Sequence, residues 1–347
     1  MKIFKKLTVI AAAVTMLFAI SACANGSSSS DSDDKKNPET PAVETPEEET
    51  PEEEKPEEVK TVAVYDESSG MINITLTFYS DKNWEVYTDY ETKKGKPSKG
   101  ILEAGTYTGS PEKDGDISLT VTKVMSKNGG TEDLPADNQK AIKVTVISGL
   151  MEMGELSGQT LYFIRRAEEI AVFNFIYKGN EYSQAYIEDY KFYTDNTFRA
   201  IRNGEISIIG YYEEDDDPGK DGPITLHGTY MFNDSSKEFK PIPSSGSIVD
   251  ASIDNDILTS RLGEHARQIA VYAAEYEEEG VPVTDKYYFY ADGAFLETFS
   301  TNGMEVPGWY GTYTISIPSG DTEEEIGLTF SYFYDSDKKF FDWNGRG

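Results

Sequence analysis

One short stretch occurs three times in this chain and constrains its fold more than any other feature. The shared pattern is Phe-Tyr-x-Asp-x-x-aromatic, found in residues 78–84, 192–198 and 289–295. In each copy two aromatic residues end an apolar run, an aspartate-led turn reverses the chain, and a further aromatic residue opens the next run. Asp292-Gly293 is the clearest turn of the three, because glycine readily takes the positive φ that a type I′ hairpin needs. The pattern predicts three β-hairpins of one kind.

Other landmarks recur around these hairpins in the same order. An aliphatic-Ala-Val-aromatic segment begins at 62, 170 and 269, Gly-x-Tyr begins at 105, 210 and 311, and Ile-x-Leu begins at 117, 224 and 326. Several landmarks in one order at similar spacing indicate a tandem repeat. The sequence therefore predicts units at 61–168, 169–268 and 269–347, with the third unit incomplete because it lacks the segment that closes the first two.

Apolar and polar residues alternate within each unit. Ile72, Ile74, Leu76 and Phe78 share one face of the first hairpin, while polar residues lie between them. This period of two is typical of a half-buried antiparallel strand. About eight such strands can be placed in a complete unit, and eight up-and-down strands close naturally into a barrel. We expect an all-β chain of lipocalin-like barrels or meanders, with a flattened sandwich as the alternative.

The aromatic residues beside the hairpin turns are the candidate ligand or interaction face. If each turn has two loop residues, the tyrosine of every copy lies opposite the aromatic residue that follows the turn. Packing in the core explains most of the 23 tyrosines, so the candidate is limited to these cross-strand pairs. The residues are Tyr79, Trp84, Tyr193, Phe198, Tyr290 and Phe295.

The first residues have the features of an export signal. Lys2, Lys5 and Lys6 precede an apolar run, which predicts a signal peptide over residues 1–22. Residues 20–23 read Ile-Ser-Ala-Cys and resemble a bacterial lipobox. The resemblance implies cleavage before Cys23 and attachment of lipid to its sulfur, and several acyl chains would anchor the protein stably. The alternative is an ordinary secretory signal followed by a chance cysteine.

The location expected from this start is the cell envelope. Ala24 is not the aspartate that retains some lipoproteins in the inner membrane, so we expect the outer membrane, on its surface or its periplasmic face. Residues 23–60 then form an acidic tether with proline at 46, 51 and 56. Proline blocks helix propagation and the glutamates repel one another, so the tether is expected to be disordered and extended.

Charge and composition exclude several classes of function. The net charge of −30 argues against nucleic-acid binding, which needs a basic face. Cys23 is the only cysteine, so no disulfide can form within the chain. His227 and His265 lack the spacing of a metal site, and no nucleophile motif or phosphate-binding loop is present. We expect His227 to be an ordinary strand residue and His265 to be exposed. We expect no enzyme activity, no metal and no cofactor.

The hairpins, the Gly-x-Tyr strands and the closing segment at 156–162 resemble bacterial lipocalin-like lipoprotein domains. Tandem copies behind an acidic tether resemble the surface lipoproteins of host-associated spirochaetes. The resemblance implies a protein held on the membrane by its N-terminal lipid, with non-enzymatic β-barrel modules that bind a protein or host-surface partner. Two alternatives stay open: a lipocalin-like carrier of a small apolar ligand, and a carbohydrate-binding or carbohydrate-active protein.

Overall fold

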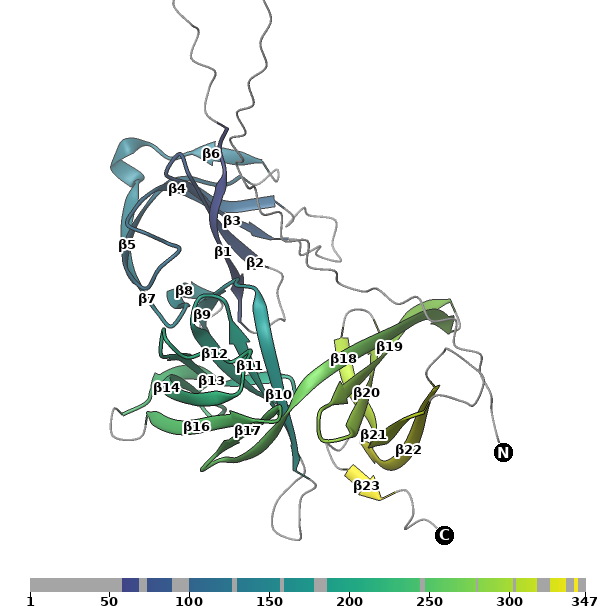
Figure 1. Cartoon of the computed structure of the whole chain (residues 1–347). Helices are drawn as coiled ribbons and strands as arrows, with labels where there is room; N and C mark the ends of the chain where they lie inside the picture. Colours follow the sequence, from purple (N-terminus) through teal and green to yellow (C-terminus); the bar gives the residue numbers. More distant parts are fainter. Residues whose placement is uncertain are drawn as a thin grey trace, which may run out of the picture. The chain divides into compact units, whose positions relative to one another are not determined.

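The protein is built almost wholly of antiparallel strands, as the sequence predicts (Figure 1). The computed structural model describes residues 58–68, 74–88, 100–126, 130–156, 159–177, 186–243, 247–278, 280–301, 304–316, 325–334 and 340–342. Within these ranges the only helix is the short 3₁₀ turn Ala136–Asn138. The predicted signal peptide, Cys23 and nearly all of the tether lie outside the described residues.

The first unit is a closed barrel of eight antiparallel strands. Neighbours in the sequence pair in turn, and the ring closes where the last strand pairs with the first. The ring consists of β1 (Thr61–Glu67), β2 (Ile74–Tyr79), β3 (Asn83–Thr88), β4 (Gly100–Thr108), β5 (Gly115–Met125), β7 (Lys140–Ile147), β8 (Leu150–Leu156) and β9 (Gln159–Arg165). The short β6 (Thr131–Asp133) pairs with β5 outside the ring.

The second unit repeats this topology strand for strand. Its ring closes through the pairing of β10 with β18, and a short strand again sits beside the fifth strand of the ring. The ring consists of β10 (Glu169–Tyr177), β11 (Tyr186–Tyr193), β12 (Thr197–Arg202), β13 (Glu205–Tyr212), β14 (Gly222–Asn233), β16 (Ile248–Asp254), β17 (Ile257–Ser260) and the first half of β18 (Gly263–Glu278). The short strand is β15 (Glu238–Pro241).

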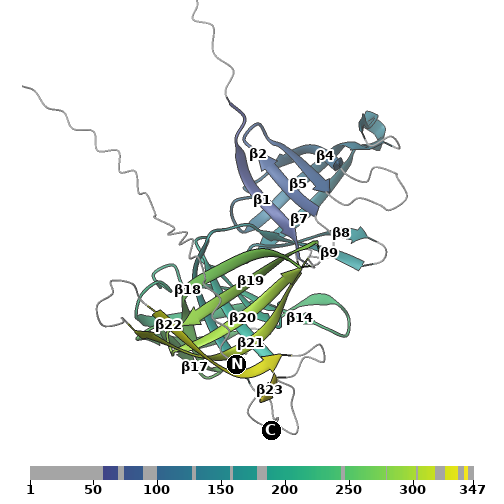
Figure 2. The ribbon, with the colours of Figure 1, turned by 90° about the vertical axis from the view of Figure 1, so that its right-hand side faces the viewer.

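The third unit is an open sheet that begins within β18. The second half of β18 leaves the barrel and pairs with β19, and the chain then meanders through β23 (Figure 2). The further strands are β19 (Val281–Tyr290), β20 (Ala294–Thr301), β21 (Met304–Ser316), β22 (Glu325–Tyr334) and β23 (Phe340–Asp342). Among the described residues no strand pairs β22 or β23 with the free edge of β18. The expectation of an incomplete third unit is confirmed.

The three hairpins share one turn, which is longer than the two-residue loop considered from the sequence. Phe78 pairs with Trp84, β2 ends at Tyr79 and β3 begins at Asn83, so the loop has three residues. Lys82 takes a φ of 65° at the end of this loop. Asn196 and Gly293 hold the same place with φ of 60° and 83°. This is a type I turn followed by a left-handed residue. The aromatic partner across each turn is therefore the phenylalanine and not the tyrosine, which corrects the expected pairing by one residue.

The tyrosines of the Gly-x-Tyr segments form hydrogen bonds with the backbone of these turns. In the second unit the Tyr212 hydroxyl donates to the Tyr193 carbonyl at 2.7 Å, and its amide donates to the Asn196 carbonyl at 3.0 Å. The hydroxyls of Tyr107 and Tyr313 make the equivalent bonds at 2.9 Å and 3.0 Å. The repeated sequence landmarks thus correspond to one local structure that fixes the start of each unit.

Aromatic side chains dominate the core of the first barrel. Tyr65, Phe78 and Trp84 are buried there among aliphatic residues from all sides of the ring. The Tyr65 ring lies edge-on to Phe78, and its hydroxyl donates to the Pro111 carbonyl at 2.5 Å. Burial raises the pKa of Tyr65 to about 12, although the neighbouring Arg165 partly opposes this rise.

We expect the first barrel to lose stability in alkali because of Tyr65. Between pH 10 and 12 the unfolded chain releases the phenol proton while the folded barrel keeps it, so the free energy of unfolding falls as pH rises. Urea unfolding at pH 8, 10 and 11, followed by tryptophan fluorescence, measures this loss. Tyr65→Phe should show a weaker dependence on pH across this range. An identical pH dependence in wild type and Tyr65→Phe would contradict the assignment.

Candidate functional site

The six aromatic residues singled out in the sequence do not form an exposed face. Trp84, Phe198 and Phe295 point into their units and are buried in the cores. Tyr193 and Tyr290 are buried as well, and only Tyr79 stays partly exposed, with its hydroxyl donating to Glu85 at 2.6 Å. Five of the six candidate residues therefore pack inside the units or where the units meet, and a shared exposed face is not what they form.

The tyrosines beside the turns lie where one unit meets the next. Tyr290 of β19 belongs to a buried cluster with Ile187 and Ala266 of the second barrel. Tyr193 lies under the guanidinium of Arg199, 4.1 Å from its ring centre, and Arg199 donates to the Arg165 carbonyl at 2.8 Å. Tyr79 has no preceding barrel to pack against among the described residues, which accounts for its exposure.

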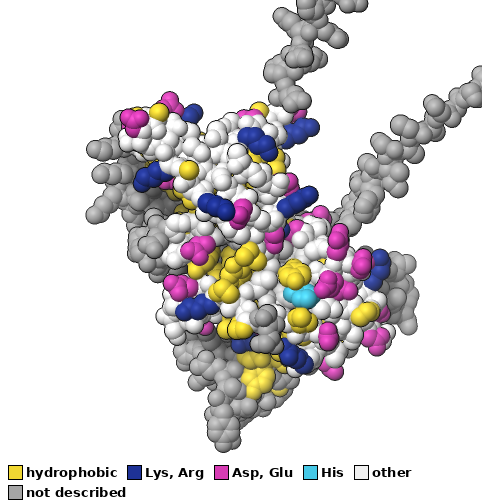
Figure 3. Space-filling model, turned by 90° about the vertical axis from the view of Figure 1, so that its left-hand side faces the viewer, with side chains coloured by type: hydrophobic (Ala, Val, Ile, Leu, Met, Phe, Trp, Pro, Cys, Tyr) yellow, Lys and Arg dark blue, Asp and Glu magenta, His cyan; other side chains and the backbone are white. Residues whose placement is uncertain are grey.

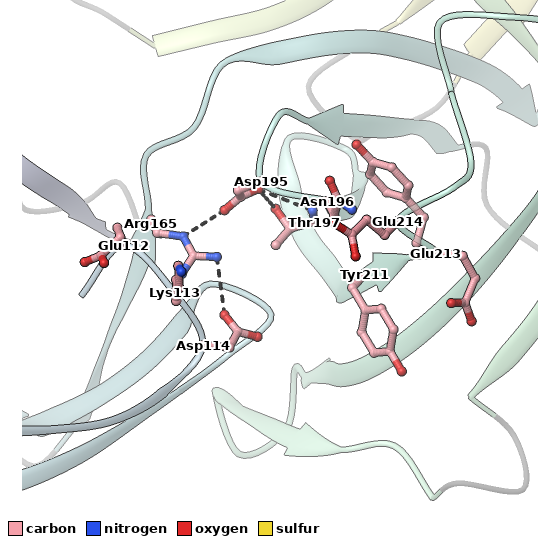
Figure 4. Close-up of a pocket in the computed structure, with 11 residues that line it drawn as sticks. Glu112, Lys113, Asp114, Arg165, Asp195, Asn196, Thr197, Tyr211, Glu213 and Glu214 are labelled. Carbon is pink, nitrogen blue, oxygen red and sulfur yellow. Dashed lines mark hydrogen bonds and ion pairs between the residues drawn. The ribbon is translucent and has the colours of Figure 1, made fainter. Parts of the chain in front are cut away.

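A cleft of about 530 Å³ lies between the end of the first barrel and the first turn of the second (Figure 4). Charged side chains contribute most of its lining, together with two tyrosines. The lining residues are Glu112, Lys113, Asp114, Arg165, Asp195, Asn196, Thr197, Tyr211, Tyr212, Glu213 and Glu214. Five carboxylates and two cations make this an acidic cleft.

Arg165 is the central charge of the cleft and joins the two barrels. Its side chain is only 8% exposed, and its Nε donates to Asp195 Oδ2 of the second barrel at 2.8 Å (Figure 4). Its Nη2 donates to Asp114 Oδ1 of the first barrel at 3.3 Å. Burial works against the charged guanidinium, but the hydrogen bond to Asp195 and its charge outweigh this, so the pKa of Arg165 is raised.

Both carboxylates beside Arg165 are held by further bonds. Asp195 Oδ1 accepts the Thr197 hydroxyl at 2.6 Å, and Asp114 accepts the amides of Ser148 and Gly149. The arginine also recurs in the repeat: Arg267 pairs with Phe173 as Arg165 pairs with Tyr65. Neither arginine could be singled out from the sequence, because both lie outside the repeated landmarks. Asp195 could have been singled out, because it is the aspartate of the second Phe-Tyr-x-Asp copy.

One rim of the cleft carries an exposed aromatic platform. Tyr211 is 41% exposed and stacks on His227, with ring centres 4.5 Å apart. His227 Nε2 lies 2.5 Å from Glu213 Oε1, and Ile248 stands opposite His227 on the next strand. Figure 3 shows hydrophobic side chains gathered beside a histidine on one face of the molecule. His227 is thus a strand residue, as predicted, and also part of this surface.

A second polar cluster lies inside the second barrel. Glu188 Oε1 accepts from Arg202 Nη2 at 2.7 Å, and His265 Nε2 lies 3.4 Å from Glu188 Oε2. Burial opposes the charge of Glu188, yet His265 and Arg202 outweigh it, so the pKa of Glu188 is lowered. The sequence-based expectation that His265 is exposed was wrong. It sits on the inward face of β18, against the rings of Phe175 and Tyr190.

In the described part of the chain no three His, Cys, Asp or Glu side chains are grouped so that they could hold an ion. The described residues also include no helix long and apolar enough to cross a membrane. The cleft instead offers carboxylates and a flat aromatic surface, which suit the binding of a polar or positively charged group.

No family model matches this chain, and no curated protein is significantly similar to it in sequence.

Proposed function

We propose that the chain is a lipid-anchored, non-enzymatic protein of the cell envelope whose tandem β-barrels serve as binding modules. The observation that carries this proposal is the cleft at Arg165, where two closed barrels meet and present charged and aromatic side chains outward. The lipobox-like residues 20–23 supply the anchor, and the acidic tether supplies the distance between the membrane and the modules.

The interiors of the barrels favour binding at the outside. Sixteen buried residues, among them Leu76, Phe78 and Trp84, form the core cluster of the first barrel. The interior of the second barrel is filled by its own core cluster, which includes Phe173 and Phe192. A small barrel is either filled by side chains or holds one small ligand, and these clusters favour the filled kind. Transport of a small apolar molecule is the alternative, and a bound molecule found by native mass spectrometry would favour it.

The cleft favours a positively charged partner over an anionic one. Arg165 is engaged by two carboxylates, while Glu112, Glu213 and Glu214 add three further acids. The net charge of −30 also steers cationic groups towards the protein. Tyr211 adds an aromatic face on which a cationic group can rest. A basic segment of a protein partner combines these features, and binding should weaken as salt concentration rises.

Lipid attachment at Cys23 is tested in intact cells that make the protein. We expect cells fed radiolabelled palmitate to label the wild-type chain and to leave Cys23→Ser unlabelled, because the acyl chain requires the thiol. Proteinase added to the same cells should remove the barrels if they are displayed on the surface. Protection from proteinase, with lipid attached, would place the modules on the periplasmic face.

The control for this experiment is Ser21→Thr, which alters the same segment and keeps the cysteine. It should be labelled like the wild type. Unlabelled wild-type protein that is released into the medium would contradict the anchor and would favour an ordinary secretory signal. The fold and the binding cleft do not depend on this result.

A further inference from the structure

The open third sheet exposes side chains that the closed barrels bury. Tyr272 takes the place of Tyr65 and Phe173, yet it is 37% exposed where both of those are 0% exposed. Ile326 is 40% exposed, whereas Ile117 and Ile224 at the same position are each 1% exposed. Among the described residues, therefore, no strand covers this inner face of the third unit.

The two closed barrels show what covers this face. In the first barrel, β7, β8 and β9 complete the ring and bury Val144, Val146, Met151, Met153 and Phe163 in the core. In the second, the same three places are taken by β16, β17 and the first half of β18. The complement of the open sheet is thus an antiparallel segment of up to three strands with apolar residues on its inner face.

The backbone of the open sheet is also available for pairing. In the first barrel the last strand joins β1 through Arg166 N to Val64 O at 2.7 Å, and through Ser68 N to Tyr162 O at 2.9 Å. The strand register places Val271, Ala273 and Glu275 of β18 where β1 and the residue after it have Val64, Asp66 and Ser68. Among the described residues no strand pairs with this part of β18 on that side. Unpaired edges of this kind accept a further strand.

Charge indicates which strand would fit. In the first barrel two cations of the closing segment pair with acids on the strands that it joins, Lys143 with Asp116 at 2.7 Å and Arg166 with Asp66 at 2.6 Å. The free part of β18 carries the exposed glutamates Glu275, Glu277 and Glu278. We propose that the open third unit binds a basic, amphipathic β-strand segment of a protein partner, which completes the half barrel as β7–β9 complete the first.

A second copy of the chain fits this surface less well. Pairing two copies through β18 would bring the same three glutamates close together across a two-fold axis. Like charges directly opposite one another destabilise strand pairing. We therefore expect a basic protein segment as the partner, and self-association of the chain through β18 would contradict this expectation. It goes beyond the proposed anchor and cleft, and neither of these is needed for it.

The chain itself contains a suitable probe. A fluorescent synthetic peptide of residues 140–166 carries the inner apolar residues of β7–β9. Its four basic residues, Lys140, Lys143, Arg165 and Arg166, outnumber its two acidic ones, Glu152 and Glu155. We expect saturable binding of this peptide to the full chain, measured by fluorescence anisotropy. Ala273→Pro removes an amide from the free edge and Tyr272→Asp places a charge on the inner face, so each should weaken binding at least tenfold.

Both β18 variants leave the first barrel unchanged, so they separate this site from exchange of the peptide into the first barrel. Met231→Ala changes an exposed residue of the second barrel and should bind like the wild type. A scrambled peptide of the same composition should not saturate. Circular dichroism must show that both β18 variants keep their strands. Absence of binding, equal binding by Ala273→Pro, or a wild-type dimer that Tyr272→Asp dissolves would each overturn the proposal.

Discussion

Replacing Gly210 by alanine should strongly destabilise the second barrel. An added Cβ would lie 2.2 Å from the His227 carbonyl oxygen and 2.5 Å from the Phe198 ring. The carbonyl belongs to the neighbouring strand β14, so β13 and β14 would have to separate. We expect a loss of about 3 kcal/mol or more, at the upper end of the range for overpacked cores. Urea unfolding of the purified chain measures it.

The matched control is Gly130→Ala, where the nearest atom to an added Cβ is 3.9 Å away. This variant should unfold at the same urea concentration as the wild type. Gly105 and Gly311 should behave like Gly210, because their Cβ atoms would lie 1.8 Å and 2.0 Å from carbonyl oxygens of the adjacent strands. Equal urea midpoints of unfolding for Gly210→Ala and Gly130→Ala would show that the backbone at this β-bulge shifts to accommodate the added methyl group.

These glycines show why the repeat could be recognised from sequence. Each lies at a β-bulge where the backbones come too close for a side chain. The tyrosine two residues later must reach the hairpin turn. Both requirements are local, and each is met by one residue type, glycine at the bulge and tyrosine two residues later. They therefore leave a pattern that can be read without the structure, and the pattern predicts the strands and the all-β class.

The register of the turns was harder to predict, because it depends on a conformation that several residue types can take. Lys82, Asn196 and Gly293 all hold the left-handed position, although lysine does so rarely. Since Asp292-Gly293 favours a two-residue turn by itself, the sequence pointed to a pairing one residue away. The bonds from Tyr107, Tyr212 and Tyr313 to these positions select the longer loop.

The candidate site could not be predicted because it arises where units meet. Asp195 was visible as a turn residue, but its partner Arg165 lies 30 residues earlier, at the end of another barrel. His265 faces inward only because β18 closes the second ring before it continues into the third sheet. Neither relation has a local sequence pattern. The pairing of a buried cation such as Arg165 with its carboxylates is set by tertiary packing alone.

Arg165→Met should weaken the junction of the two barrels as strongly as a core substitution. Methionine keeps much of the side-chain volume but leaves the Asp195 carboxylate, 18% exposed, without its cation. Removing one partner of a buried ion pair is costly because the remaining charge stays desolvated. We expect a loss of about 3 kcal/mol in the free energy of unfolding. Urea unfolding followed by tryptophan fluorescence measures this loss.

The exposed pair Lys143–Asp116 provides the matched control, since its side chains are 69% and 55% exposed. Lys143→Met should be indistinguishable from the wild type, because water screens and solvates both groups. Arg165→Met combined with Asp195→Asn should recover part of the loss, since the amide carries no charge to leave unpaired. If the double variant were less stable than the sum of the single losses implies, Asp195 would stabilise the junction without Arg165. The cleft would then owe its shape to the apolar contact of Ile164 with Ile209 and Phe239.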